Sequence, residues 1–496
     1  MAVSSPEAPC RSGSTETSPL LQSQSQVPVT TCYGSEDAAP LVEQQGRPTT
    51  TWHQEAKTMV TWSAPLIMTH LLQRSVNFMG VFAVGRIGAV ELGAVSLASI
   101  TASLIGNSLI QGLATGLDTL CAQAYGSGNK HLVGLHMQRM VFFILPCVLP
   151  LMVLWWEADK ILVHVLPERR LAELTGTYLR ILSFRIPASV FFECGKRFVQ
   201  AQGIFSAATY VLLITAPLNA FLTWFLVWRL DWGFVGAPTA VVITENLMAV
   251  LLVLYIWLVD GSQCWGGFTT KAFSNWGQMI RLSLPGMLMN IAEFAVEEIL
   301  TLASAQFGTS RLAAQSALVT MVTITYNIFL PVSIAASTRV AHWVGAQAID
   351  AAKTSAKVTI MLGLVISAFV LVILSSLRHQ IPLLFTQDPE VTEVLVSVLP
   401  IATAMQVFDG MATISHGLLR GIGCQELAGY FNLVAYYAIA LPVALGAAFH
   451  LGWEIEGLWI GITTGLCIVS VFEFWWLYRS NWDDAAEKAT RRNQCD

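Results

Sequence analysis

Twelve long apolar runs constrain this chain more than any other feature. Each has about 20 to 27 residues, and an α-helix of about 20 residues crosses the roughly 30 Å hydrocarbon core of a bilayer. Backbone polar groups inside lipid must be paired within their own segment, which favours helices. We therefore predict an all-α polytopic membrane protein with twelve transmembrane helices. The runs are 58–83, 92–117, 136–156, 173–199, 207–229, 235–259, 280–306, 313–337, 356–378, 393–418, 427–449 and 456–479.

The composition agrees with a membrane protein and argues against other classes. Only 12% of the residues are charged and 54% are hydrophobic, whereas soluble proteins carry roughly 25% charged residues. The net charge of -5 gives no reason to expect nucleic-acid binding. The nine cysteines are scattered without CxxC or Cys/His spacing, so we expect buried free thiols and no metal or organic cofactor. The sequence has no HExxH motif and no nucleophile–base spacing, so we do not expect an enzyme.

Both ends of the chain are polar. Residues 1–50, rich in Ser, Thr, Gln and Pro, are predicted to be a disordered tail, and 480–496 a second tail. An even number of spans puts both tails on one side, and the excess of Lys and Arg on that side predicts that it is cytosolic. Residues 16–21 have the form acidic-x-x-x-Leu-Leu, which resembles a vacuolar or lysosomal sorting signal. The vacuolar membrane and the plasma membrane are both candidate locations.

The second half of the chain repeats the first at an offset of about 220 residues. Four short motifs recur at this offset, and we infer two pseudo-symmetric six-helix lobes in the same orientation, related by an axis along the membrane normal. The N-lobe is 58–259 and the C-lobe is 280–479, joined by a cytosolic linker at 260–279. The matching pairs are 85–88 with 306–308, 122–127 with 341–346, 200–203 with 420–423, and 232–236 with 453–457.

Four acidic residues inside apolar runs are the main candidates for function. Glu293, Glu297 and Glu298 share the run 280–306, and Asp409 lies in another. A charge at the bilayer centre costs about 2.5 kcal/mol or more, so these carboxyl groups must be paired, reached by water or protonated. At about 100° per residue, Glu293 and Glu297 share one helix face, and Glu298 is rotated about 140° from Glu293. Because three ionised carboxylates this close would repel one another, we expect the group to hold a proton, which indicates ion-coupled transport.

Two longer motifs point to a family. The segment GLDTLCAQAYG at 116–126 follows the second run, and GLLRGIG at 417–423 follows the tenth. Both resemble motifs of the eukaryotic multidrug and toxic compound extrusion (MATE) family, and the likeness covers nearly all of 58–479. The resemblance implies exchange of protons or sodium for organic cations and other amphipathic solutes. It also implies alternating access to a cavity between the two lobes.

The resemblance assigns roles to three of these acidic residues. The family has an acid on its seventh helix and a second one five positions later, which are Glu293 and Glu298 here. An acid after Phe on the tenth helix corresponds to Asp409. Two family acids are absent, because Arg311 and Gly80 stand in their places. The resemblance therefore implies proton handling in the C-lobe, and it favours Glu298 where helix geometry alone favours Glu297.

Three polar residues are candidate partners of the acids. Tyr326 and Asn290 could satisfy a buried carboxyl group, and the Tyr326 ring could also hold a flat cation through cation–π contact. His416 follows Asp409 by seven residues and so shares its helix face. It could relay a proton or serve only as a packing residue.

Two further charges are possible accessory residues. Arg74 lies midway along the first run, where it needs a carboxylate or carbonyl partner or binds an anionic substrate. Asp118 begins the turn after the second run, where it could cap the next segment or pair with a basic loop residue, and so act in structure or gating.

From these residues we expect a monomeric, proton-coupled antiporter that exports or sequesters small amphipathic organic solutes, with cations as the favoured class. Two alternatives stay open. The same carboxylates with nearby hydroxyl groups could coordinate sodium as the coupling ion. A flippase for a lipid or lipid-linked substrate is the other alternative, and Arg74 is its only hint.

Overall fold

The computed structural model describes residues 42–44, 47–165, 168–386 and 388–494. The sorting motif predicted at 16–21 lies outside the described residues, as does most of the predicted N-terminal tail. A short antiparallel hairpin, β1 (Val42–Gln44) with β2 (Arg47–Thr49), precedes the first helix in a stretch that was predicted to be disordered. The described chain is otherwise helical.

The first half of the chain forms six spanning segments, several of which contain π-helical or 3-10 turns. A π-helical turn widens the second segment, and a 3-10 turn divides the fourth. The segments are α1 (Trp52–Val84), α2 (Ala89–Thr101) with η1 (Ala102–Asn107) and α3 (Ser108–Gly126), α4 (Lys130–Trp156), α6 (Arg169–Leu182) with η2 (Ser183–Arg185) and α7 (Ile186–Gln200), α8 (Ser206–Trp224) with η3 (Phe225–Arg229), and η4 (Gly233–Val235) with α9 (Gly236–Leu258). The short helix α5 (Ala158–Val165) precedes the fourth segment.

The second half repeats this plan after a linker that contains two 3-10 turns, η5 (Ser262–Cys264) and η6 (Thr270–Phe273). The segments are α10 (Gly277–Ser304) with η7 (Ala305–Phe307), α11 (Thr309–Gly345), α12 (Ile349–Ser376), α14 (Pro389–Ile422), α15 (Gln425–Val434) with η8 (Ala435–Ala440), α16 (Leu441–Leu445) and η9 (Gly446–His450), and α17 (Glu454–Arg479). The short helices α13 (Ile381–Phe385) and α18 (Trp482–Gln494) lie outside this count.

The twelve segments agree with the twelve predicted runs. Among the described residues, ten helices are long and apolar enough to cross a membrane. The two segments outside that set are α1 and α6–α7, and the second of these carries several charged residues. Some helices extend well past their apolar runs: α3 continues to Gly126 and α11 to Gly345. Hydropathy marks only the part of a helix that lies in lipid, whereas backbone hydrogen bonding continues into the aqueous region.

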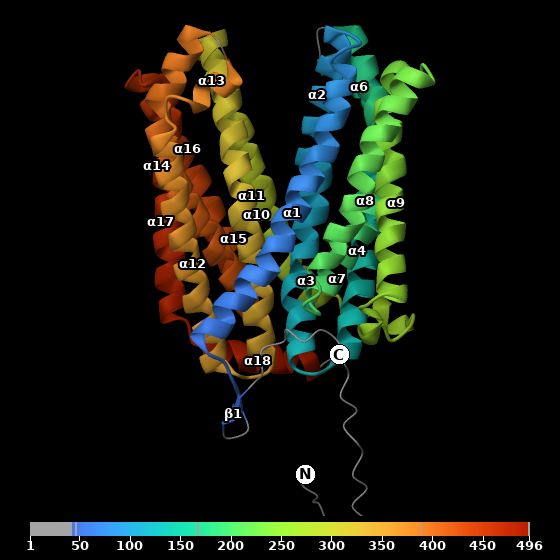
Figure 1. The fold of residues 1–496 in the computed structure, drawn as a ribbon, viewed down its shortest axis with the longest axis vertical. Coiled ribbons are helices and arrows are strands. Elements are labelled where there is room, and N and C mark those ends of the chain that lie inside the picture. The colour runs from blue at the N-terminus through green and yellow to red at the C-terminus, as the bar shows by residue number, and fades with distance from the viewer. Residues whose placement is uncertain (1–41, 45–46, 166–167, 387, 495–496) are drawn as a thin grey trace, which may run out of the picture. The chain divides into compact units, whose positions relative to one another are not determined.

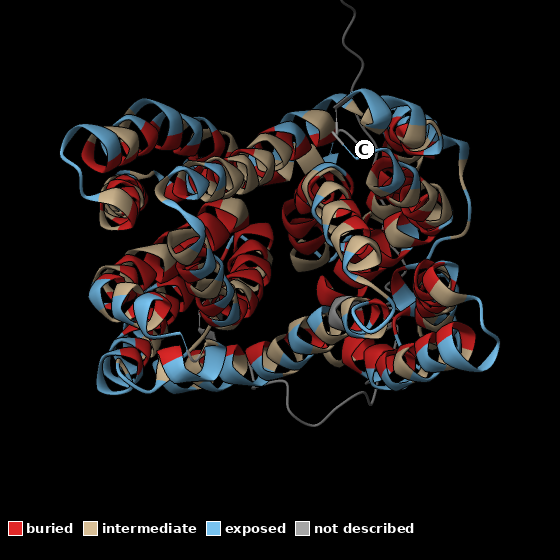
Figure 2. Ribbon diagram, turned by 90° about the horizontal axis from the view of Figure 1, so that it is seen from above, coloured by how far each residue is buried: buried red, intermediate tan, exposed pale blue. Residues whose placement is uncertain are grey.

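The outer helix faces suit a lipid environment. Figure 2 shows the buried residues on faces turned toward neighbouring helices, with exposed residues around the outside. Large apolar side chains on those outer faces are strongly exposed, including Trp257, Leu302 and Phe369. An apolar outer surface of this kind is stable in a bilayer and not in water.

The described residues from 42 to 494 form one compact unit, within which α3 joins the two lobes. This helix packs against both α10 and α11, while α1 packs against α8 in its own lobe and against α11 and α12 in the other. Figure 1 shows the contacts of α1 and α3 with the C-lobe toward the end where α1 begins and α18 lies, which we call the terminal end. On the opposite side, the tips of α2 and α6 stand away from α13.

Two glycines show that the halves are related by symmetry. A Cβ atom added to Gly126 would lie 2.1 Å from the carbonyl oxygen of His342, and one added to Gly345 would lie 2.2 Å from that of Gln123. Each residue of the first contact corresponds to the residue 219 positions away in the second. The α3–α11 crossing is therefore nearly two-fold symmetric, and the internal repeat read from the sequence has a structural counterpart.

Candidate functional site

Acidic residues from two helices of the C-lobe converge with tyrosines from two further elements. Glu293 on α10 accepts a hydrogen bond of 2.8 Å from the Nδ2 atom of Asn432 on α15. The charges of Glu293 and Glu297 both act on Asp409 of α14. The phenols of Tyr326 on α11 and Tyr436 on η8 lie in the field of Glu293 and Asp409. We call Glu293, Glu297, Asp409, Tyr326 and Tyr436 the acidic cluster.

Glu298 lies at the margin of this cluster. Its charge acts on Glu297, whereas the acids that act on Asp409 are Glu293 and Glu297. This is the arrangement expected from helix geometry, since positions four apart share a face and positions five apart do not. Pro285 lies within α10 two turns before Glu293.

His416 pairs with an acid that the sequence analysis overlooked. Its Nε2 atom lies 3.2 Å from the Oε1 atom of Glu473 on α17. Glu473 has no exposed surface, and its Oε2 atom accepts a 2.5 Å hydrogen bond from the hydroxyl of Ser415. Glu473 could have been found from the sequence, because it is an acid inside the apolar run 456–479, as Glu293 is inside 280–306.

A small cavity separates the acidic cluster from the terminal end. Four of its polar lining residues come from three helices of the C-lobe: Asn290 on α10, His416 and Arg420 on α14, and Gln425 on α15. Thr115 on α3 lines its remaining side. The cavity therefore lies between the lobes, next to the predicted site residues Asn290 and His416.

The charges of the N-lobe largely neutralise one another. Glu193 bridges Lys196 and Arg197 at 2.8 Å each, and Arg197 also reaches Asp118 at 3.1 Å. The sequence suggested that Asp118 caps a segment or pairs with a loop residue, but its nearest basic partner belongs to α7. All four side chains are buried, so removing one would leave an unpaired charge.

Two other N-lobe charges lie in different settings. The charge of Arg74 acts on Glu297 and Tyr326 across the lobe boundary. Glu245 pairs with Arg185 and accepts a 2.8 Å hydrogen bond from Ser189. Arg185 also donates to Asn107 at 3.0 Å, in the π-helical turn η1.

Polar contacts join the lobes at the terminal end. Thr119 donates to the carbonyl of Arg420 at 2.7 Å, and Gln123 donates to that of Gly421 at 3.0 Å. His342 of the C-lobe contacts the carbonyl of Ala201 at 2.7 Å. We call these three contacts, with the 3.7 Å approach of Asp118 to Arg420, the interlobe contact. They hold α3 and α7 against the C-lobe at this end.

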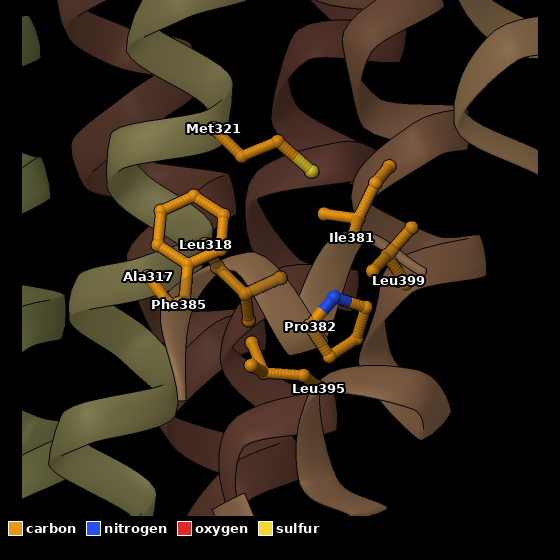
Figure 3. Close-up of a pocket in the computed structure, with 8 residues that line it drawn as sticks. All are labelled: Ala317, Leu318, Met321, Ile381, Pro382, Phe385, Leu395 and Leu399. Carbon is orange, nitrogen blue, oxygen red and sulfur yellow. The ribbon is translucent and has the colours of Figure 1, made fainter. Parts of the chain in front are cut away.

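An apolar crevice in the C-lobe lies apart from these groups. It is formed by α11, α13 and α14 (Figure 3), and its eight lining side chains are all apolar. Met321, Ile381 and Phe385 are among them. Such a crevice offers no group that could hold an ion or exchange a proton, so the acidic cluster is the better candidate site.

Comparison with known proteins identifies the family. The family model described as MatE matches residues 65–225 and again residues 285–445, two stretches displaced by 220 residues. An uncharacterized transporter of Schizosaccharomyces pombe is 37% identical over 89% of this chain and 82% of its own length. Multidrug and toxin extrusion protein 2 of Mus musculus is 28% identical over 88% of this chain and 77% of its own length.

A solved structure has the same fold. The crystal structure of the eukaryotic MATE transporter AtDTX14 superposes with a TM-score of 0.84 at 26% identity, covering 89% of this chain and 99% of that one. The family resemblance and the fold predicted from the sequence are thereby confirmed. Because the family model covers most of both lobes and the relatives span nearly the whole membrane region, this chain is a multi-pass membrane transporter of the MATE (MatE) family and not an enzyme.

Proposed function

We propose that the protein is a proton-coupled antiporter that exports or sequesters small amphipathic organic solutes, with cations as the favoured class. The observation that carries the proposal is the acidic cluster, in which Glu293 and Asp409 interact across two helices and their charges also act on the phenols of Tyr326 and Tyr436. Carboxylates in a desolvated site bind either a proton or an organic cation, and aromatic rings add cation–π attraction. We infer that Glu293, Glu297 and Asp409 carry the exchange and that Glu298 has a lesser part.

Competition for the same carboxylates would enforce exchange. A proton arriving from the side opposite the terminal end neutralises the cluster and releases the cation. Loss of that proton on the other side restores the negative charge and with it the affinity for cargo. A ligand shifts a conformational equilibrium only through its different affinity for the two states, and a site that holds one ligand at a time supplies that difference.

The proposed sidedness follows from the charge distribution. Lys and Arg favour the terminal end as the cytosolic side, so the interlobe contact would close the protein toward the cytosol in this structure. Cargo would then be moved out of the cytosol, into a vacuole or across the plasma membrane. A monomer suffices, since both lobes belong to one chain and the acidic cluster lies within one lobe.

The test is uptake of a fluorescent organic cation into proteoliposomes under an imposed pH gradient. We expect uptake to follow the gradient in the wild type and to fall at least about tenfold in Glu293→Gln, because the amide cannot release a proton. Glu456→Gln, which removes an acid from the end of α17, is the matched control. Uptake that does not depend on the pH gradient but follows a sodium gradient would show that sodium is the coupling ion.

The lipid flippase alternative has weaker support. Arg74 was its only hint, and the charge of Arg74 acts on Glu297 of the acidic cluster. An arginine whose field falls on a cluster of carboxylates does not make an anion site on its own. Transfer of a labelled lipid between leaflets, without uptake of the organic cation, would revive this alternative.

A further inference from the structure

Glu473 and His416 form a buried pair. Proton-for-cation exchange at the acidic cluster does not by itself require this pair. Glu473 is completely buried in α17, and the site offers it two partners, the imidazole of His416 and the hydroxyl of Ser415. A carboxylate is costly to bury, and a pair of this kind is weak evidence for stability. A different explanation is that the carboxylate sets the orientation and charge of the imidazole.

His416 stands between the acidic cluster and the interlobe cavity. On one side, its charge acts on both Glu293 and Asp409. On the other side, it lines the cavity shared with Arg420 and Gln425. The titratable or charged groups facing it are Glu473 on α17, Glu293 on α10, and Asp409 and Arg420 on α14. Arg420 also lines the cavity and its charge acts on Glu293, but an arginine side chain does not exchange protons in proteins.

The cavity has the polar groups needed to hold a water molecule. Two buried atoms of its lining side chains lack a hydrogen-bond partner, Nε of Arg420 and Oε1 of Gln425. Nε2 of His416 faces Glu473 at 3.2 Å, which leaves Nδ1 of the same ring for the cavity. The residues His416 and Gln425 are 7% and 3% exposed. Buried polar atoms of this kind are normally satisfied by ordered water, which typically makes two to four hydrogen bonds.

We propose that Glu473 positions His416 as a proton relay, and that a water molecule bound by His416, Arg420 and Gln425 carries the proton from it toward the terminal end. This inference rests on the proposed proton coupling. In the first step, a carboxylic acid of the cluster gives its proton to neutral His416, leaving a carboxylate and an imidazolium. In the second, once that water meets the aqueous phase, the imidazolium gives the proton to it from Nδ1, the water passes one of its own protons to bulk water, and the imidazole is neutral again. Glu473 stays ionised throughout and stabilises the imidazolium.

The position of Thr115 makes the relay dependent on conformation. Thr115 belongs to α3 of the N-lobe and closes one side of the cavity. While the interlobe contact holds, the water site is sealed from the terminal end. When α3 moves away, the same water meets the aqueous phase and the proton can leave. Protons therefore leave through the relay only in the state that is open to the terminal end, which is also the state in which cargo binds.

The experiment compares two transport modes in the same proteoliposomes. Net uptake of a fluorescent organic cation driven by a pH gradient requires proton release, whereas exchange of labelled for unlabelled cation at equal pH does not. We expect Glu473→Gln and His416→Gln to lower net uptake about tenfold and to leave equal-pH exchange within about twofold. Glu473→Gln should also move the dependence of net uptake on terminal-side pH toward lower pH, because the imidazolium has lost its counter-charge.

Further variants separate positioning from folding. Glu473→Asp keeps the charge and should recover part of the net uptake, and the double variant Glu473→Gln/His416→Gln should be no worse than His416→Gln alone. Normal net uptake in His416→Gln, additive losses in the double variant, or equal loss of both transport modes would overturn the proposal. Failure of the proposed function looks different, since wild-type uptake would then ignore the pH gradient.

Discussion

At the scale of single residues, the acids of α10 should not be equivalent. We predict that Glu297→Gln lowers pH-driven uptake at least about tenfold, as Glu293→Gln does, and that Glu298→Gln changes it less than about threefold. The reason is that the charges of Glu293 and Glu297 act on Asp409, whereas the charge of Glu298 acts on Glu297. A tenfold change corresponds to about 1.4 kcal/mol.

The measurement is initial uptake in proteoliposomes with matched protein content, and Asp409→Asn serves as a positive control. If Glu298→Gln were as damaging as Glu293→Gln while Glu297→Gln were harmless, the spacing of five implied by the family resemblance would describe this site better than the geometry of the α10 face.

The candidate site shows what sequence alone can and cannot predict. Intramembrane acids such as Glu293 and Asp409 stand out because a charge in an apolar run is costly wherever its partners are. The partner of His416 could not be chosen in advance, since Glu473 is 57 residues away along the chain and meets it only when α14 packs on α17. Likewise, the distance between Arg74 and Glu297 depends on how the two lobes meet.

At the scale of helices, the periodicity of apolar runs locates the spans but not their aqueous extensions. The ends of α3 and α11 lie beyond lipid, and their close crossing depends on Gly126 and Gly345, which no hydropathy pattern marks as contact residues. The helix α18 was also missed, because its mixture of Asp, Lys and Arg reads as a tail. Its buried face consists of Trp482 and three alanines.

The glycine crossing gives a prediction about α3 and α11. We expect Gly126→Ala and Gly345→Ala each to lower the free energy of unfolding by about 1–3 kcal/mol, because the new methyl group meets a backbone oxygen that cannot rotate away. The two effects should be similar in size, since the contacts are reciprocal. Thermal unfolding in detergent measures this, with Gly277→Ala as the control because a Cβ there would meet nothing within 4 Å. Unaltered stability in both variants would contradict the close crossing.

At the scale of the whole membrane unit, α1 bridges the two lobes. Glu55, near the start of α1, has no exposed surface. Its carboxylate accepts hydrogen bonds from two nitrogens of Arg339 on α11, the shorter of which is 2.7 Å. The guanidinium of Arg339 also lies over the rings of Trp62 and Trp343, at 5.5 and 4.4 Å. This pair ties α1 to the C-lobe at the terminal end, close to the contact between His342 and Ala201.

Breaking that pair should shift the equilibrium between the two access states. Loss of one partner of a buried ion pair costs about 3–5 kcal/mol, and this cost falls on the state that contains the pair. We therefore expect Glu55→Arg and Arg339→Glu singly to favour opening at the terminal end, and the double charge swap to restore closure at least in part.

The readout is maleimide labelling of Thr115→Cys, in a background without the nine native cysteines. Thr115 is only 4% exposed here and should become reachable when α3 leaves the C-lobe. Glu173→Gln, which breaks the exposed pair with Arg169, should leave labelling unchanged. Equal labelling in the single and double variants would mean that the Glu55–Arg339 pair does not hold the terminal end closed, and closure would then depend on the glycine crossing and the interlobe contact alone.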